Sequence, residues 1–288
     1  MKREEFSFRS RDGLEIACYR WPGAQPAGIV QIAHGMGEHS MRYEHVAAAL
    51  ADAGFQVYAN DHRGHGRTAK TKESLGDFGA GGWDALIDDM AALTRLARER
   101  EGGLPLTVLG HSMGSFAAQQ YLLDHSSLIA GAVISGSVSA DKLELDPTRE
   151  VDLTSLNQEI ENPRTDFDWL TRDPAIVDAY IADPLCGFGV NSRSLESMAA
   201  GLERMADPAQ LKRIRSDLPI YILAGDGDPL NRKLEWLKPM AERYRAAGVR
   251  DVTEKYYAGG RHEMLNEINR DEVYRDLLAW IRRAIGAK

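Results

Sequence analysis

The pentapeptide Gly-His-Ser-Met-Gly at residues 110–114 restricts the fold of this chain more than any other stretch. Residues 104–109 before it are apolar and β-prone, and residues 115–123 after it have helical composition and spacing. A serine at such a strand-to-helix turn is typical of a nucleophile elbow, in which a strained backbone lifts the hydroxyl above the sheet. Gly110 and Gly114 lack a Cβ, so strand and helix can approach closely there. The flanking elements favour this interpretation over a chance match in a loop.

Short buried-strand patterns alternate with helical patterns along most of the chain, which favours a mostly parallel α/β sheet. After an N-terminal hairpin around Asp12 and Gly13, we expect strands at residues 29–33, 55–59, 131–135, 220–224 and 252–257. We expect further helices at residues 43–53, 83–100, 234–247 and 270–285. The alternation stops at residues 140–207, which predicts a helical cap inserted between core segments 1–139 and 208–288.

Length and charge narrow the functional classes. A chain of 288 residues fits one α/β domain with an inserted lobe. The formal net charge is −8, and no basic run is interleaved with aromatic residues, so we expect no nucleic-acid partner. Cys18 and Cys186 lie far apart in sequence and favour a reducing compartment over a disulfide framework. Neither a signal peptide nor an apolar run of about 20 residues is visible, which predicts a soluble, cytoplasmic protein. The oligomeric state stays open.

A serine nucleophile needs a base, and the base needs an acid that orients it. In chains with this elbow the order is serine, acid, histidine. Six of the eight histidines precede Ser112, which leaves His125 and His262. His125 ends the helix that leaves the elbow, whereas His262 follows a predicted strand at its carboxyl end, so His262 is the predicted base.

The acid is expected just after the strand at residues 220–224. Asp226 and Asp228 both qualify, and the pattern alone does not separate them. The oxyanion needs backbone donors, which we assign to Met113, next to the serine, and to Met36 in the glycine-containing loop 34–37.

Several acidic and histidine residues near this loop could be read as metal ligands, namely His34, Glu38, His39, Asp61, His62 and His65. The triad explains the site without a metal, and no His-Glu-x-x-His motif is present. We therefore expect no metal and no cofactor, and interpret residues 61–66 as a structured turn.

Together these motifs resemble α/β-hydrolases of the monoacylglycerol lipase and lysophospholipase-like family. The motifs that carry the resemblance lie at residues 34–39, 42–43, 61–66, 110–114 and 225–228 and at His262. The resemblance implies an α/β-hydrolase fold with a mostly parallel eight-stranded sheet and a helical cap. It favours Asp228 over Asp226 as the acid and agrees with Met36 and Met113 as donors. It places Glu38 and Arg42 near the alcohol end of the pocket, although a salt bridge that fixes the loop explains them equally well.

The predicted cap departs from the apolar lids of relatives that act at membranes. Its first part is acidic, with Asp141, Glu144, Asp146, Glu150, Asp152, Glu159, Glu161, Asp166 and Asp168. Anionic lipid would repel this segment, so we expect at most transient contact with a membrane surface. Apolar residues gather later, at Phe167, Trp169, Leu170, Tyr180, Ile181, Phe188 and the stripe 195–205. They form the cap's own core, or some of them, with Trp169 and Leu170 as candidates, roof an acyl pocket.

The sequence thus predicts a serine hydrolase that cleaves small-molecule carboxylic esters through an acyl-enzyme, with monoacylglycerol, lysophospholipid or similar acyl esters as substrates. Short-chain esterase, thioesterase, perhydrolase and aminopeptidase activities use the same triad and stay open. A binding module that keeps the fold without turnover is the alternative from another class.

Overall fold

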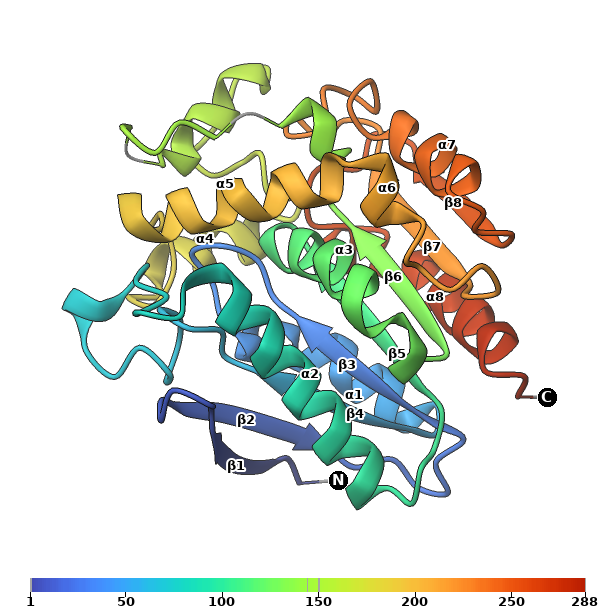
Figure 1. The fold of residues 1–288 in the computed structure, drawn as a ribbon. Helices are drawn as coiled ribbons and strands as arrows, with labels where there is room; N and C mark the ends of the chain where they lie inside the picture. The colour runs from blue at the N-terminus through green and yellow to red at the C-terminus, as the bar shows by residue number, and fades with distance from the viewer. Residues whose placement is uncertain (1, 144, 150, 288) are drawn as a thin grey trace.

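The computed structural model describes residues 2–143, 145–149 and 151–287, so Glu144 and Glu150 of the acidic segment lie outside the described residues. An eight-stranded sheet with strand order β1-β2-β4-β3-β5-β6-β7-β8 forms the centre of the molecule (Figure 1). The N-terminal hairpin is β1 (Glu4–Arg9) and β2 (Glu15–Trp21), which pair antiparallel. β2 is also antiparallel to β4, and the pairs from β4 to β8 are parallel. The predicted fold class is confirmed.

The strands of the parallel part follow the predicted alternation closely. They are β3 (Gly28–Ala33), β4 (Phe55–Asn60), β5 (Leu106–His111), β6 (Gly131–Ser135), β7 (Ile220–Gly225) and β8 (Val252–Tyr257). β3 to β7 are buried along their whole length, because helices cover both faces of the sheet. In β3, Ile29 packs into the core on one face, and Val30 and Ile32 pack into the core on the other.

Two layers of helices enclose this sheet (Figure 1). α1 (Glu44–Asp52) and α8 (Arg270–Ala284) contribute to the core on one face. α2 (Gly82–Arg100), α3 (Met113–His125) and α7 (Lys238–Ala246) contribute to the core on the other. Short 3-10 turns connect them at Ser40–Tyr43, Lys72–Ser74, Ser126–Leu128 and Met264–Asn266.

The helix expected at residues 234–247 begins four residues later, at Lys238. Arg232, Lys233 and Leu234 all have positive φ, at 53°, 53° and 76°. Three successive left-handed residues cannot belong to an α-helix, so the chain turns there first. Pro239 then stands in the first turn of α7, a position where its missing N–H costs nothing.

The segment 140–207 is helical, and its described residues contain no strand. It comprises 3-10 turns at Ala140–Lys142 and Leu153–Glu159, then α4 (Pro174–Ala182) and α5 (Ser192–Ala206), and α6 (Pro208–Leu211) follows it. Asp173 and Asn191 cap α4 and α5 through their side chains. The apolar stripe of α5 is buried, and α5 contacts α2 and α3. Much of the predicted stripe therefore attaches this segment to the core.

Among the helices of the described chain, none combines the length and the apolar character that a bilayer crossing requires.

Candidate active site

Ser112 lies at the turn between β5 and α3 with φ 54° and ψ −122°, a backbone conformation that a residue with a side chain rarely adopts. The turn is possible because of its glycines. A Cβ on Gly110 would lie 2.3 Å from the carbonyl oxygen of Gly114, and a Cβ on Gly114 would lie 2.2 Å from that of Ala33. The amide of Ser112 donates to the carbonyl of Ser135 at 3.0 Å, which ties the turn to β6. The serine therefore occupies the strained turn that the motif predicts.

Asp228 and His262 form a buried pair beyond the ends of β7 and β8. His262 Nδ1 lies 3.0 Å from Asp228 Oδ2, and both side chains are fully enclosed. The backbone amide of Leu230 and the side-chain amide of Asn231 also donate to the Asp228 carboxylate, at 2.9 and 3.1 Å. These bonds fix the carboxylate in place and orient the imidazole.

The two other candidates for these positions lie elsewhere. Asp226 is exposed, and its carboxylate accepts from the Gly259 amide at 2.6 Å, so it stabilises the loop that leads to His262. His125 is half-buried at the far end of α3, where its ring packs against Tyr121 at 5.1 Å. The structure therefore brings His262 into contact with Asp228 and with neither Asp226 nor the region of His125.

The other nitrogen of His262 has no hydrogen-bond partner within the described chain. This Nε2 atom is buried, and Ser112 and His262 line one cavity. The ring is held between His111 and Trp169, with centroid distances of 4.7 and 4.9 Å. Burial lowers the pKa of His262, but the carboxylates of Asp228, Glu263 and Glu38 outweigh it, so the pKa is raised above its usual value.

The amides expected to hold an oxyanion both lie beside Ser112. Met113 is the first residue of α3, where backbone N–H groups have no partner within the helix and the helix dipole favours negative charge. Met36 lies in the loop 34–37, and Met36 and Met113 both line the hollow next to Ser112. In the described chain neither amide donates a hydrogen bond to another group. Both are therefore available to a ligand.

A buried ion network holds the loop 34–37. Arg42 Nη1 lies 2.5 Å from Glu38 and 2.6 Å from Glu263, and Nη2 donates to Glu263 at 2.8 Å. Glu38 also accepts from the Gly35 amide at 2.5 Å and from the Tyr43 hydroxyl at 2.7 Å. This is the geometry of a salt bridge that fixes the loop, although Glu38 and Arg42 also line the cavity at Ser112.

Glu263 is a member of the site that the sequence reasoning missed. Burial raises its pKa, but Arg42 outweighs burial and lowers the pKa to about 2, so the carboxylate is charged. Its partner stands 221 residues away in the sequence. The available signal was an acid directly after the predicted base.

Two hollows meet at Ser112. One has a volume of about 10 Å³, which is room for about one water molecule, and its lining includes Glu38, Arg42, Leu170, Tyr180 and Glu263. The other has a volume of about 190 Å³ and a mostly apolar lining. Trp169 contributes to both. The apolar hollow is lined by Phe116, Leu143, Leu145, Val151, Leu153, Leu156, Met198 and Leu230 together with the residues already named.

The roof of the apolar hollow comes from an unexpected segment. Leu143, Leu145 and residues 151–156 belong to the stretch that the sequence reasoning treated only as acidic. Of the apolar residues considered for the roof, Trp169 and Met198 line this hollow, whereas Ile181 is 49% exposed and Phe188 packs on His65. The missed signal is that apolar residues alternate with the charged ones in this stretch.

The histidines considered as metal ligands pack around the loop 34–37. His34 Nδ1 lies 2.8 Å from the Gly35 carbonyl, and its Nε2 accepts from the His62 amide at 2.9 Å. His65 Nε2 accepts from the Gly37 amide at 3.3 Å. Burial lowers the pKa of His34 to about 4 and that of His65 to about 3, so both are neutral near pH 7 and act as hydrogen-bonding supports.

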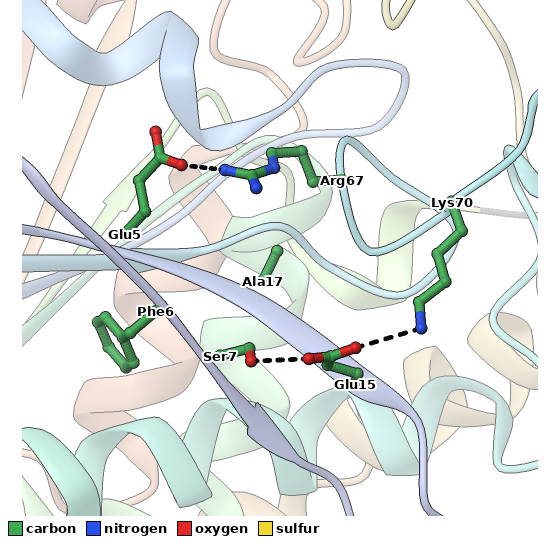
Figure 2. Close-up of a pocket in the computed structure, with 7 residues that line it drawn as sticks. All are labelled: Glu5, Phe6, Ser7, Glu15, Ala17, Arg67 and Lys70. Carbon is green, nitrogen blue, oxygen red and sulfur yellow. Dashed lines mark hydrogen bonds and ion pairs between the residues drawn. The ribbon is translucent and has the colours of Figure 1, made fainter.

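A larger hollow of about 450 Å³ lies on the N-terminal hairpin (Figure 2). Its charged groups bind one another: Arg67 pairs with Glu5, and Lys70 pairs with Glu15 at 3.3 Å. Ser7 also donates to Glu15 at 2.9 Å. Because these charges are paired and the hollow is on the hairpin instead of at the carboxyl ends of the parallel strands, it is not the candidate site.

The chain has recognisable relatives among known proteins. Residues 24–269 match the family model described as serine aminopeptidase, S33. A monoacylglycerol lipase of Mycolicibacterium smegmatis is 31% identical over 97% of each chain. The monoglyceride lipase of Homo sapiens is 28% identical over 94% of this chain and 88% of its own. The structure of a thermostable carboxyl esterase from Bacillus coagulans, in complex with glycerol, is 32% identical, covers 99% of each chain and has a TM-score of 0.88.

Proposed function

Because the chain belongs to the serine aminopeptidase, S33 family of α/β-hydrolases, we propose that it hydrolyses monoacyl esters such as monoacylglycerols with Ser112, His262 and Asp228 as its catalytic residues. The chain is a serine hydrolase that acts on esters. The proposal concerns which residues catalyse the reaction and which esters are the substrates. The assignment of residues rests on the buried Asp228–His262 pair. Within the described chain Nε2 of His262 has no hydrogen-bond partner, and His262 lines the same cavity as Ser112, whose backbone is strained.

The reaction follows from this geometry. His262 Nε2 accepts the hydroxyl proton as Ser112 Oγ attacks the ester carbonyl, and Asp228 stabilises the imidazolium that forms. The amides of Met36 and Met113 donate to the oxyanion of the tetrahedral intermediate. His262 then returns the proton to the departing alcohol, which leaves an acyl group on Ser112. Water, activated by the same imidazole, releases the acid and restores the serine.

The two hollows assign the two halves of the substrate. The apolar hollow takes the acyl chain, and the polar groups around the small cavity face the alcohol. The apolar hollow of about 190 Å³ is smaller than the roughly 300–1,000 Å³ of pockets that enclose drug-sized ligands, which favours an acyl chain of medium length over a long one. We therefore propose medium-chain monoacyl esters as the preferred substrates, and lysophospholipids only where their acyl chain fits this hollow.

Peptide substrates fit the site less well. An aminopeptidase binds the positive amino group of its substrate, and carboxylates are the natural partners of that charge. Glu38 and Glu263 are the carboxylates that line the cavity with Ser112, and both already bind Arg42. Their oxygens are therefore engaged within the protein, and this engagement favours uncharged hydroxyl groups over a substrate amino group on the polar side.

The surroundings of the site support three related proposals. We propose that residues 140–207 act as the cap, since they supply much of the roof of the apolar hollow. The acidic surface of this segment supports only transient contact with anionic membranes. Cys18 and Cys186 are both free thiols, which supports the reducing cytoplasm as the compartment.

The assignment is tested with p-nitrophenyl esters of two to sixteen carbons, 1-monoacylglycerols of matched length, and aminoacyl p-nitroanilides. We expect kcat/KM to peak at medium chains and the anilides to be refused. Ser112→Ala should abolish turnover, while Ser126→Ala, at the far end of α3, should retain it. Asp228→Asn should lower kcat about 10⁴-fold because the imidazole loses its orienting carboxylate, whereas Asp226→Asn should lower it less than about twofold, as expected for an exposed side chain.

Each component can fail separately. Turnover by Ser112→Ala would show that Ser112 is not the nucleophile. Equal losses of kcat in Asp228→Asn and Asp226→Asn would contradict the choice of Asp228 as the acid. A maximum at sixteen carbons would contradict the assignment of the acyl chain to this hollow. Efficient cleavage of anilides would replace the ester substrates by peptides.

A further inference from the structure

Three side chains with metal-binding atoms lie close together, and none of them is among the residues proposed to cleave the ester. They are His39, Asp183 and Cys186, and one ligand atom of each lies within 4.8 Å of those of the other two. His39 follows the loop 34–37, while Asp183 and Cys186 belong to the turn after α4 in the cap segment. Residues from two distant parts of the chain therefore form one cluster.

The backbone holds this cluster in place. Gly187 donates its amide to the carbonyl of Gly37 at 2.9 Å, which fixes the two segments against each other. The Leu185 amide binds Asp183 Oδ1 at 2.8 Å, and Oδ2 then faces His39 Nε2 at 3.0 Å. Groups that orient a ligand in this way are typical of metal sites, because they reduce the ordering cost of binding.

The donor set selects the metal. Imidazole, carboxylate and thiolate are all ligands of Zn²⁺, whereas Ca²⁺ and Mg²⁺ require mostly oxygen. In a tetrahedral zinc site with bonds of about 2.0–2.3 Å, ligand atoms lie about 3.3–3.8 Å apart. Atoms now within 4.8 Å of one another reach that geometry with side-chain adjustments of about 1 Å or less. One carboxylate and one thiolate balance the two positive charges of the ion.

Although the sequence alone led us to expect no metal, we propose from this cluster that His39, Asp183 and Cys186 bind Zn²⁺ or a similar thiophilic divalent cation, with water as the fourth ligand. The Asp183 side chain is 33% exposed, which leaves a path for the ion and the water. Burial raises the pKa of the Cys186 thiol, Arg42 lowers it, and Asp183, Glu38 and Glu263 raise it further, so the cation must displace the thiol proton as it binds. Binding would link the cap segment to the loop 34–37 and stabilise their contact, so the site is regulatory or structural and takes no part in bond cleavage.

The experiment uses tag-free, chelator-treated full-length protein with free thiols. Co²⁺ serves as a spectroscopic probe because a cobalt–thiolate bond gives a charge-transfer absorption that Zn²⁺ then displaces. We expect one equivalent of Co²⁺ to give this absorption and Zn²⁺ to raise Tm. Cys186→Ser, His39→Gln and Asp183→Asn should each weaken Zn²⁺ binding by at least about tenfold. The absorption should be absent in Cys186→Ser.

Matched variants separate this site from other thiols and histidines. Cys18→Ala removes the buried cysteine of β2, and His125→Gln removes a half-buried histidine at the far end of α3, so both should bind as the parent protein does. Circular dichroism of the metal-free variants checks the fold. An absence of stoichiometric binding by the parent protein, or unchanged affinity in all three ligand variants, would overturn the proposal. The readouts are binding and Tm, so they do not depend on the proposed ester substrates.

Discussion

The two sides of Ser112 are built in opposite ways. On one side a buried arginine binds two buried glutamates, and about 10 Å³ of free space remains. On the other side apolar residues from α3, the segment 140–207 and the loops enclose about 190 Å³. The polar side is closed and rigid because charged groups buried together must satisfy one another completely. The apolar side keeps free space because no side chain of the protein fills it, and an acyl chain of suitable length can occupy it.

This contrast separates two properties of the enzyme. Glu38 connects the polar network to the loop that carries the Met36 amide, so that network should set the rate of bond cleavage for every substrate. The apolar hollow does not include the Asp228–His262 pair, so it should set which acyl chains are accepted. Substitutions on the two sides should therefore have effects of different kinds as well as different sizes.

Among the substitutions that test this contrast, the largest effect is expected from Arg42→Met, which removes the charge and keeps most of the side-chain volume. Glu38 and Glu263 then lose their common partner, which should cost about 3–5 kcal/mol of unfolding free energy because buried charges are left uncompensated. The loop 34–37 should also shift, and a misplacement of about 1 Å lowers kcat about 100-fold. Urea unfolding and kcat/KM measure the two effects, and the loss should be the same for short and medium esters.

Arg204→Met is the matched control. Arg204 pairs with Asp124 at the surface and is 36% exposed, so its loss should change stability by less than about 0.5 kcal/mol and leave kcat unchanged. If Arg42→Met acts only on medium chains, the polar network does not serve catalysis in general, and the contrast fails.

A smaller and selective effect is expected from Leu156→Trp on the apolar side. The larger ring fills part of the hollow, so the preferred acyl chain should become shorter. The kcat/KM for the best substrate of the parent protein should fall about tenfold, as expected when a methylene loses its place in an apolar pocket. Acetate esters should react as before. Ile181→Trp, at an exposed position outside the hollow, should leave the whole chain-length profile unchanged.

The sequence predicted the parts of the molecule that depend on local patterns. The alternation of strands and helices and the turn at Ser112 are readable within short windows, and the order of serine, acid and histidine is readable along the chain. The comparisons confirm the family and the type of enzyme. The early start expected for α7 was wrong because three non-glycine residues in a row take up positive φ, which no propensity indicates.

The parts that sequence reasoning missed depend on distant contacts. Glu263 is buried and charged only because Arg42 reaches it from the first quarter of the chain. The roof of the apolar hollow depends on how Leu143, Leu145 and residues 151–156 lie beside α3, and the acids in that stretch concealed its apolar residues. Asp228 is buried and Asp226 is exposed because of the turn after β7, and the sequence pattern does not indicate this difference.

The smallest expected effect of this contrast concerns the pKa of His262, the proposed base. The carboxylates of the polar side raise the pKa of His262, while burial lowers it. As the proposed base, His262 must be neutral to accept the proton of Ser112, so kcat/KM should fall as the pH drops through the raised pKa of His262. Glu38→Gln removes one negative charge but keeps an oxygen for the Gly35 amide, which makes the imidazolium less favourable and lowers that pKa. The acid limb of the kcat/KM profile should therefore move to lower pH, even if kcat itself also falls. In Leu156→Trp the limb should keep its position, since that substitution changes no charge. A limb that stays in place in Glu38→Gln, or moves to higher pH, would show that the polar side does not act on His262 through its charge.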